Sequence, residues 1–161
     1  MKKLLLALSF VCTVAILPAS QADAATWDTR HFGSVQEYGS QQHQVCGYAW
    51  TDADTFALFE SGTFYQGYVT DPPPCGGFGE FGDLVAPGWL GAASSGYRDG
   101  SLLLTTSWSY NSADASHWNK YFQSLNDSGL QNWQTYAHHL WWALDANQYV
   151  GDDNFSPVLQ V

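Results

Sequence analysis

The sequence predicts an α+β fold: an antiparallel β-meander of about five strands, followed by a C-terminal helical hairpin packed on the sheet, with one disulfide. Short alternating apolar segments separated by turn signals indicate the strands. An Asp-Gly pair ahead of a further alternating segment indicates a hairpin. Two apolar stripes at helical spacing near the C-terminus indicate the helices. Strands followed by helices are typical of the α+β class.

The N-terminal segment has the features of a secretory signal peptide over residues 1–24. A cationic start at 1–3 precedes an apolar run over 4–17, and Ala-Asp-Ala at 22–24 supplies a cleavage site. The apolar run is shorter than the roughly 20 residues of a membrane-spanning helix. We therefore expect residues 25–161 to form a single α+β domain that is periplasmic or secreted.

The chain after this segment is strongly acidic. Of the 5 Lys and Arg and the 15 Asp and Glu residues, only Lys2, Lys3 and Asp23 belong to the predicted signal. Excess negative charge repels phosphate backbones and anionic lipid, so we expect neither a nucleic-acid nor a membrane partner. A basic protein partner would be attracted.

Two cysteines, Cys46 and Cys75, follow the predicted signal. Two thiols in one small exported domain favour a disulfide, with free or metal-binding thiols as the alternative. No other Cys or His lies at the short spacing of a zinc site. We predict a Cys46–Cys75 disulfide, no metal site and no cofactor.

The first predicted strand covers residues 45–50, where apolar and small residues alternate. A turn signal at 51–54 separates it from a short apolar strand at 56–59. A second turn signal at 60–63 precedes a strand at 64–69. These segments predict the beginning of the meander.

A long loop is predicted from Asp71 to Gly88. Its three consecutive prolines lack the N–H groups of a β-ladder, and its glycines weaken strands. Such loops often carry function, although a variable surface loop is an equal alternative. Beyond it, Asp99-Gly100 predicts a hairpin that leads into a strand at 101–110.

The last part of the chain predicts the helical hairpin. The first helical face carries Trp118, Tyr121, Phe122 and Leu125. The second carries Leu130, Trp133, Ala137, Leu140, Trp141 and Leu144. We expect Trp118, Trp133 and Trp141 to lie in the core.

Trp142 lies on the side of the second predicted helix opposite its apolar stripe. His138 and Asp145 are each about one helical turn away, so both can touch the indole. An indole flanked by an imidazole and a carboxylate suits a ring-shaped ligand such as a sugar. Alternatively, this face packs against the loop at 71–88. We predict ligand binding by Trp142, His138 and Asp145.

The favoured function is a small binding domain that uses exposed aromatic and carboxylate side chains. Its ligand would be a carbohydrate-like ring compound or a protein partner. One alternative is a small secreted hydrolase, for which Glu60, Asp145 and His138 are the candidates. Another is an acidic inhibitor or immunity-type protein that covers a basic site. No catalytic residue is assigned.

Overall fold

The structure is a computed structural model that describes residues 24–37, 41–68, 84–126, 129–144 and 146–161. These residues form β-strands and contain no helix. No helix long and apolar enough to span a membrane is therefore found among them. The predicted signal peptide lies outside the described residues except for its last position, and remains a prediction.

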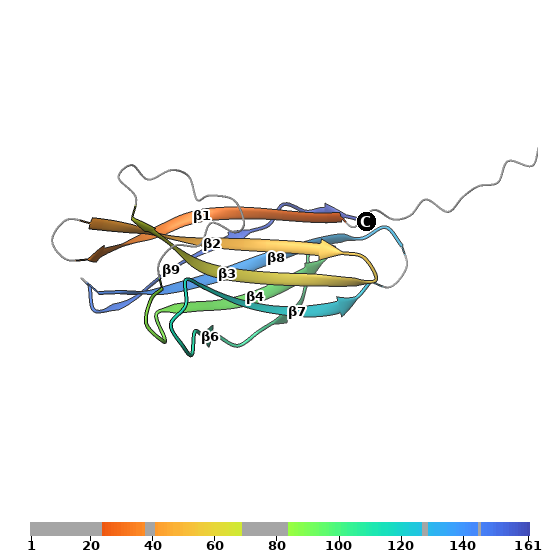
Figure 1. The fold of residues 1–161 in the computed structure, drawn as a ribbon. Helices are drawn as coiled ribbons and strands as arrows, with labels where there is room; N and C mark the ends of the chain where they lie inside the picture. The colour runs from red at the N-terminus through yellow and green to blue at the C-terminus, as the bar shows by residue number, and fades with distance from the viewer. Residues whose placement is uncertain (1–23, 38–40, 69–83, 127–128, 145) are drawn as a thin grey trace, which may run out of the picture.

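Ten strands make up the described part of the chain (Figure 1). In order they are β1 (Ala24–Glu37), β2 (Gln41–Ala53), β3 (Phe56–Tyr68), β4 (Leu90–Arg98), β5 (Ser101–Thr105), β6 (Ser109–Tyr110), β7 (His117–Leu125), β8 (Asn132–Ala143), β9 (Gln148–Phe155) and β10 (Leu159–Gln160).

The strands form two antiparallel sheets that lie face to face (Figure 1). The first sheet has the order β1-β2-β3-β7. The second has the order β10-β8-β4-β5, with β9 also on β8 and β6 also on β4. Strands β9 and β10 pair one after the other with the edge of β8 that faces away from β4. Strands β5 and β6 pair in the same way with the edge of β4 that faces away from β8. The architecture is thus a β-sandwich.

Hydroxyl groups tie the two sheets together across the core. Thr63 Oγ1 on β3 donates to the carbonyl of Gly91 on β4, at 2.6 Å. Thr135 Oγ1 on β8 donates to the carbonyl of Trp50 on β2, also at 2.6 Å. Both threonines are completely buried. Because inward positions carry hydroxyl groups as well as apolar ones, the strands have a weak hydrophobic alternation.

The predicted helical hairpin is wrong, because its two segments are strands β7 and β8. In β8, every second residue from Trp133 to Ala143 is buried, and the residues between them are half-buried. Apolar side chains lie on both faces of the strand, with Trp141 pointing inward and Leu140 outward. Together they give the spacing expected of an apolar stripe on a helix. Trp133 and Trp141 are buried as predicted, whereas Trp118 is half-buried.

The predicted five-strand meander is also too small, partly because the turn at 60–63 does not exist. Ser61, Gly62 and Thr63 lie buried in the middle of β3, which runs without a break. Gly62 is required there because a Cβ at this position would lie 2.0 Å from the ring of Tyr48 on β2. The glycine marks a close side-chain approach within a strand rather than a turn.

The Asp-Gly hairpin prediction is confirmed. Arg98 pairs with Ser101, leaving Asp99 and Gly100 as a two-residue loop with φ angles of 49° and 77°. Two positive φ angles are typical of a type I′ turn, whose twist matches that of the strands. The strand predicted at 101–110 is divided into β5 and β6, which pair with different parts of β4.

The predicted Cys46–Cys75 disulfide has one end outside the residues that the structure describes, and at its described end Cys46 is disulfide-bonded. Cys46 is fully buried on β2, whereas Cys75 lies outside the described residues. Most of the loop predicted at 71–88 lies outside them too. Residues 84–88, the end of this loop that the structure describes, include Val85, which forms an isolated β-bridge with Ala115.

Candidate functional site

The outer face of the second sheet carries a continuous row of contacting rings, here called the aromatic strip. From one end to the other it consists of Tyr97, Phe155, Tyr136, His138, Trp108, Tyr110, Tyr149 and Trp142. Neighbouring ring centroids are 4.3 to 6.4 Å apart. Rings at such separations attract one another, so the strip is a coherent surface.

The alternation of β8 builds the centre of this strip. Because the odd-numbered residues of β8 point into the core, Tyr136, His138 and Trp142 all point outward. Small residues on β4 let neighbouring rings lie across the sheet. A Cβ at Gly91 would be only 2.8 Å from the ring of Tyr110.

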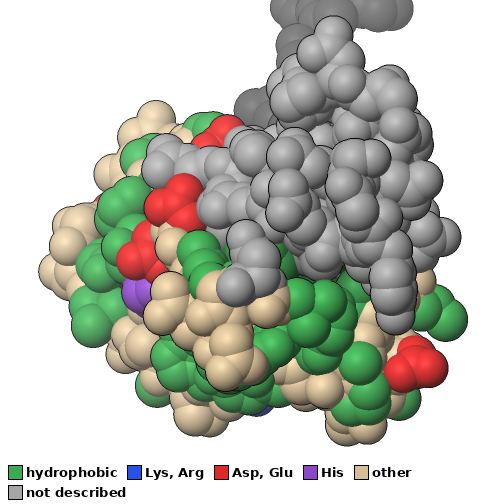
Figure 2. Space-filling view, turned by 90° about the vertical axis from the view of Figure 1, so that its left-hand side faces the viewer, with side chains coloured by type: hydrophobic (Ala, Val, Ile, Leu, Met, Phe, Trp, Pro, Cys, Tyr) green, Lys and Arg blue, Asp and Glu red, His purple; other side chains and the backbone are tan. Residues whose placement is uncertain are grey.

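The strip is accessible to a ligand. Trp108, Tyr110, Tyr149 and Phe155 are 42, 37, 42 and 47% exposed. Seen from the end of the sandwich at the left of Figure 1, the described surface shows many hydrophobic side chains with acidic ones among them (Figure 2). Contiguous exposed apolar surface of this kind marks interaction sites.

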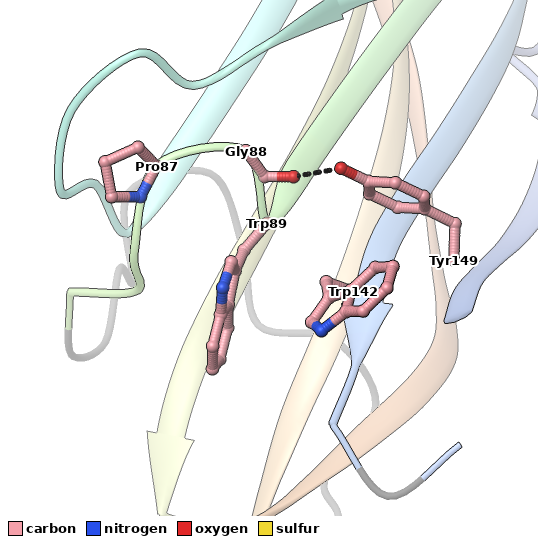
Figure 3. Close-up of a pocket in the computed structure, with 5 residues that line it drawn as sticks. All are labelled: Pro87, Gly88, Trp89, Trp142 and Tyr149. Atoms are coloured by element: carbon pink, nitrogen blue, oxygen red, sulfur yellow. Dashed lines mark hydrogen bonds between the residues drawn. The ribbon is translucent and has the colours of Figure 1, made fainter. Parts of the chain in front are cut away.

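A hollow of about 280 Å³ lies at the Trp142 end of the strip, lined by Pro87, Gly88, Trp89, Trp142 and Tyr149. Figure 3 shows the indoles of Trp89 and Trp142 on either side of it. The hydroxyl of Tyr149 donates to the carbonyl of Gly88 at 2.6 Å (Figure 3). Burial, and to a lesser extent Tyr110, raise the pKa of Tyr149 above its ordinary value.

A hydrogen-bonded chain holds His138 in the middle of the strip. His138 Nδ1 lies 3.0 Å from Asp153 Oδ1, and His138 Nε2 lies 3.2 Å from Ser95 Oγ. Because a carboxylate only accepts, Nδ1 carries the hydrogen, and in the neutral ring Nε2 accepts from Ser95. The hydroxyl of Tyr136 donates to Asp153 Oδ2 at 2.8 Å. This bond, with smaller effects of burial and charge, raises the pKa of Tyr136.

The order Ser95–His138–Asp153 is that of a hydrolytic triad. A nucleophile must reach its substrate, yet Ser95 is only 3% exposed and shares its hydroxyl with Thr105 Oγ1 at 2.8 Å. Its strand is also paired on both edges, so the surrounding N–H groups serve the ladders. The geometry therefore fixes the orientation of the imidazole more readily than it supports attack by Ser95.

Glu60, the third residue considered for hydrolysis, lies away from the strip. It is on the outer face of the first sheet, where Oε1 accepts from the hydroxyl of Tyr48 at 2.5 Å and from Asn119 Nδ2 at 2.8 Å. Glu60 and His138 are thus on opposite outer faces of the sandwich. They do not converge on one site.

The structure brings two of the three predicted site residues to one surface. Trp142 and His138 share the outer face of β8 but have Leu140 between them, so they do not touch as they would on a helix. Ring contacts through Tyr149, Tyr110 and Trp108 connect them instead. Asp145 lies outside the described residues.

The sequence reasoning missed most of the strip because it used a helical period. Read with a period of two, residues 136, 138 and 142 fall on one face, as do 149, 153 and 155. Nothing local in the sequence places Trp89 beside Trp142. That contact follows from the pairing of β4 with β8.

Comparisons with protein-family models, with curated proteins and with solved structures find no match to this chain. In the described part of the chain, no three His, Cys, Asp or Glu side chains are grouped so as to hold a metal ion. The chemistry of the strip and the hollow is therefore what indicates a ligand.

Proposed function

We propose that this protein is a binding domain whose aromatic strip holds a neutral, carbohydrate-like ligand made of several sugar rings. The unbroken row of eight contacting rings carries the proposal. Sugar rings present faces of C–H groups that pack on aromatic side chains, while their hydroxyls need hydrogen-bonding partners at the edges.

The length of the strip favours an oligomer. From Trp142 to Tyr136 it follows β8 for six residues, about 20 Å at the rise of a β-strand. A single ring covers only a fraction of that distance. A ligand that contacts the whole strip is therefore an extended chain.

Asp153 supplies the polar part of the surface. Its side chain is 44% exposed, and its oxygens lie within hydrogen-bonding distance of Tyr136 and His138. A carboxylate accepts hydrogen bonds, so its exposed part can accept from ligand hydroxyls. None of the strip residues is Lys or Arg, so an anionic sugar would meet the carboxylate without compensation.

A proline-rich peptide is the competing occupant, because aromatic surfaces also bind polyproline helices. Proline offers no N–H to Asp153, whereas a sugar offers several O–H donors. The carboxylate within the strip thus favours the sugar.

Binding to a panel of neutral polysaccharides (glucans, xylans, mannans and chitin) tests the proposal. Trp108→Ala should weaken binding about tenfold, or ~1.4 kcal/mol, since it removes an exposed ring from the middle of the strip. Tyr121→Ala is the matched control, because Tyr121 is a 57% exposed ring on the first sheet. Equal losses in both variants, absence of polysaccharide binding, or binding of poly-L-proline in its place would refute the proposal.

Hydrolysis by Ser95 is a second candidate, favoured only by the hydrogen-bond order around His138. An activated serine reacts with a fluorophosphonate probe. Labelling of the wild-type protein that disappears in Ser95→Ala would support this candidate. Absence of labelling would remove it without affecting the binding function.

A further inference from the structure

We infer that the hollow between Trp89 and Trp142 is a subsite for one six-membered sugar ring, held between the two indoles. This inference rests on the proposed function and adds the unit that the hollow recognises.

The size of the hollow matches one ring. Its volume of about 280 Å³ exceeds the roughly 150 Å³ of a cavity that admits benzene. It lies just below the ~300 Å³ at which pockets for larger ligands begin. A single substituted ring fits in a hollow of this size.

The backbone separates the indoles in a way that leaves room between them. The amide of Trp142 donates to the carbonyl of Trp89 at 2.8 Å, so their main chains are neighbours. Within the described residues, however, Trp142 makes its ring contact with Tyr149 and none with Trp89. A ring that enters this space contacts an indole on each side, whereas a ring on the open strip contacts aromatic side chains on one side only.

The hydrogen-bonding groups of the hollow suit a polyol. Among the described residues, neither Trp89 nor Trp142 uses its indole N–H in a hydrogen bond. Each N–H can donate to a ligand oxygen. The hydroxyl of Tyr149 donates to Gly88 but keeps lone pairs that accept from a ligand hydroxyl. A purely apolar ring would satisfy none of these groups.

Hydrogen bonds hold the wall of the hollow in place. The side chain of Asn111, 2% exposed, accepts from the amide of Leu90 at 2.9 Å and donates to the carbonyl of Ala86 at 2.8 Å. The amide of Gly88 donates to the carbonyl of Asn111 at 2.7 Å. These bonds fix the segment that carries Trp89, so binding requires little ordering.

Fluorine NMR of the 5-fluorotryptophan-labelled protein tests the inference. The probes are glucose, xylose, mannose, galactose and N-acetylglucosamine at millimolar concentration. We expect at least one of them to shift the resonances of Trp89 and Trp142 without shifting that of Trp108. Trp89→Ala should weaken the binding of that sugar at least tenfold. Tyr149→Phe, which keeps the ring, should weaken its binding severalfold.

Tyr121→Ala is again the matched control, and urea unfolding of each variant establishes that it is folded. If polysaccharides bind but no monosaccharide shifts Trp89 or Trp142, the subsite is refuted and the function of the strip stands. If a monosaccharide binds in the hollow but no polysaccharide binds, the subsite stands and the function of the strip fails. If no sugar of either kind binds, both are refuted.

Discussion

Acidification should destabilise this protein through His139, a histidine sealed between the two sheets. His139 on β8 is 1% exposed, and its Nε2 lies 2.7 Å from Asn154 Oδ1. Burial lowers its pKa to about 4, although the hydrogen bond to Asn154 opposes the shift. In the unfolded chain the pKa of histidine is about 6.5.

The sign and size of the effect follow from these two pKa values. Above pH 6.5 both states are neutral at His139, and its pKa difference has no effect. Between pH 6.5 and about 4, His139 is protonated in the unfolded chain but remains neutral in the native state. The free energy of unfolding therefore falls as pH falls. The complete loss is about 3 kcal/mol, at ~1.4 kcal/mol for each pH unit of difference. That is a large part of the ~5–15 kcal/mol typical of a domain.

Urea unfolding of the wild type and of His139→Gln from pH 7 to pH 4 measures this contribution. Glutamine takes up no proton, so the variant should lose stability less steeply over this range, whatever the substitution costs at pH 7. Carboxylates contribute to both proteins, and the difference between the two profiles isolates the histidine. Parallel profiles for the two proteins would show that the reasoning is wrong.

Three further substitutions test the packing and the site. Gly47→Ala places a Cβ 2.2 Å from the ring of His139 and should lower the free energy of unfolding by about 1–3 kcal/mol, measured in urea; an unchanged midpoint would contradict this. Asn111→Ala leaves buried backbone groups without partners and should cost a similar ~1–3 kcal/mol. The same variant should also weaken ligand binding in the hollow. An unchanged free energy of unfolding would show that the hydrogen bonds of Asn111 are dispensable. Asp153→Asn weakens the hydrogen bond that raises the pKa of Tyr136 and removes the smaller effect of the charge, so the phenol should ionise at lower pH in a carbon NMR titration. An unmoved titration would exclude the bond to Asp153 as the cause.

Prediction of the secondary structure succeeded where a turn depends on adjacent residues. It failed where packing between strands decides the conformation. Asp99-Gly100 marks its hairpin because few other sequences accept two positive φ angles. At Gly62 the prediction of a turn was wrong. The glycine lies within β3, where it leaves space for a tyrosine from the neighbouring strand.

The helical interpretation of residues 117–144 failed for a related reason. In β8 the buried positions include Thr135, whose hydroxyl bonds across the core to Trp50, and His139, which bonds to Asn154 on the neighbouring strand β9. Tyr136 and Trp142 lie on the outer face. When both faces mix polar and apolar residues, periodicity loses its power to distinguish strand from helix. The abundance of aromatic residues was the better indicator of strand.

By itself, the sequence determined the turn at Asp99-Gly100 and the acidic charge, whereas it placed Trp142 and His138 outward on a predicted helix that is in fact strand β8. Only the tertiary structure decided that they belong to a strip of eight rings, and that Trp89 stands beside Trp142. Turns and charge depend on residues adjacent in the chain. The strip depends on which distant strands pair, and that choice is made by packing across the whole sandwich rather than by any local pattern.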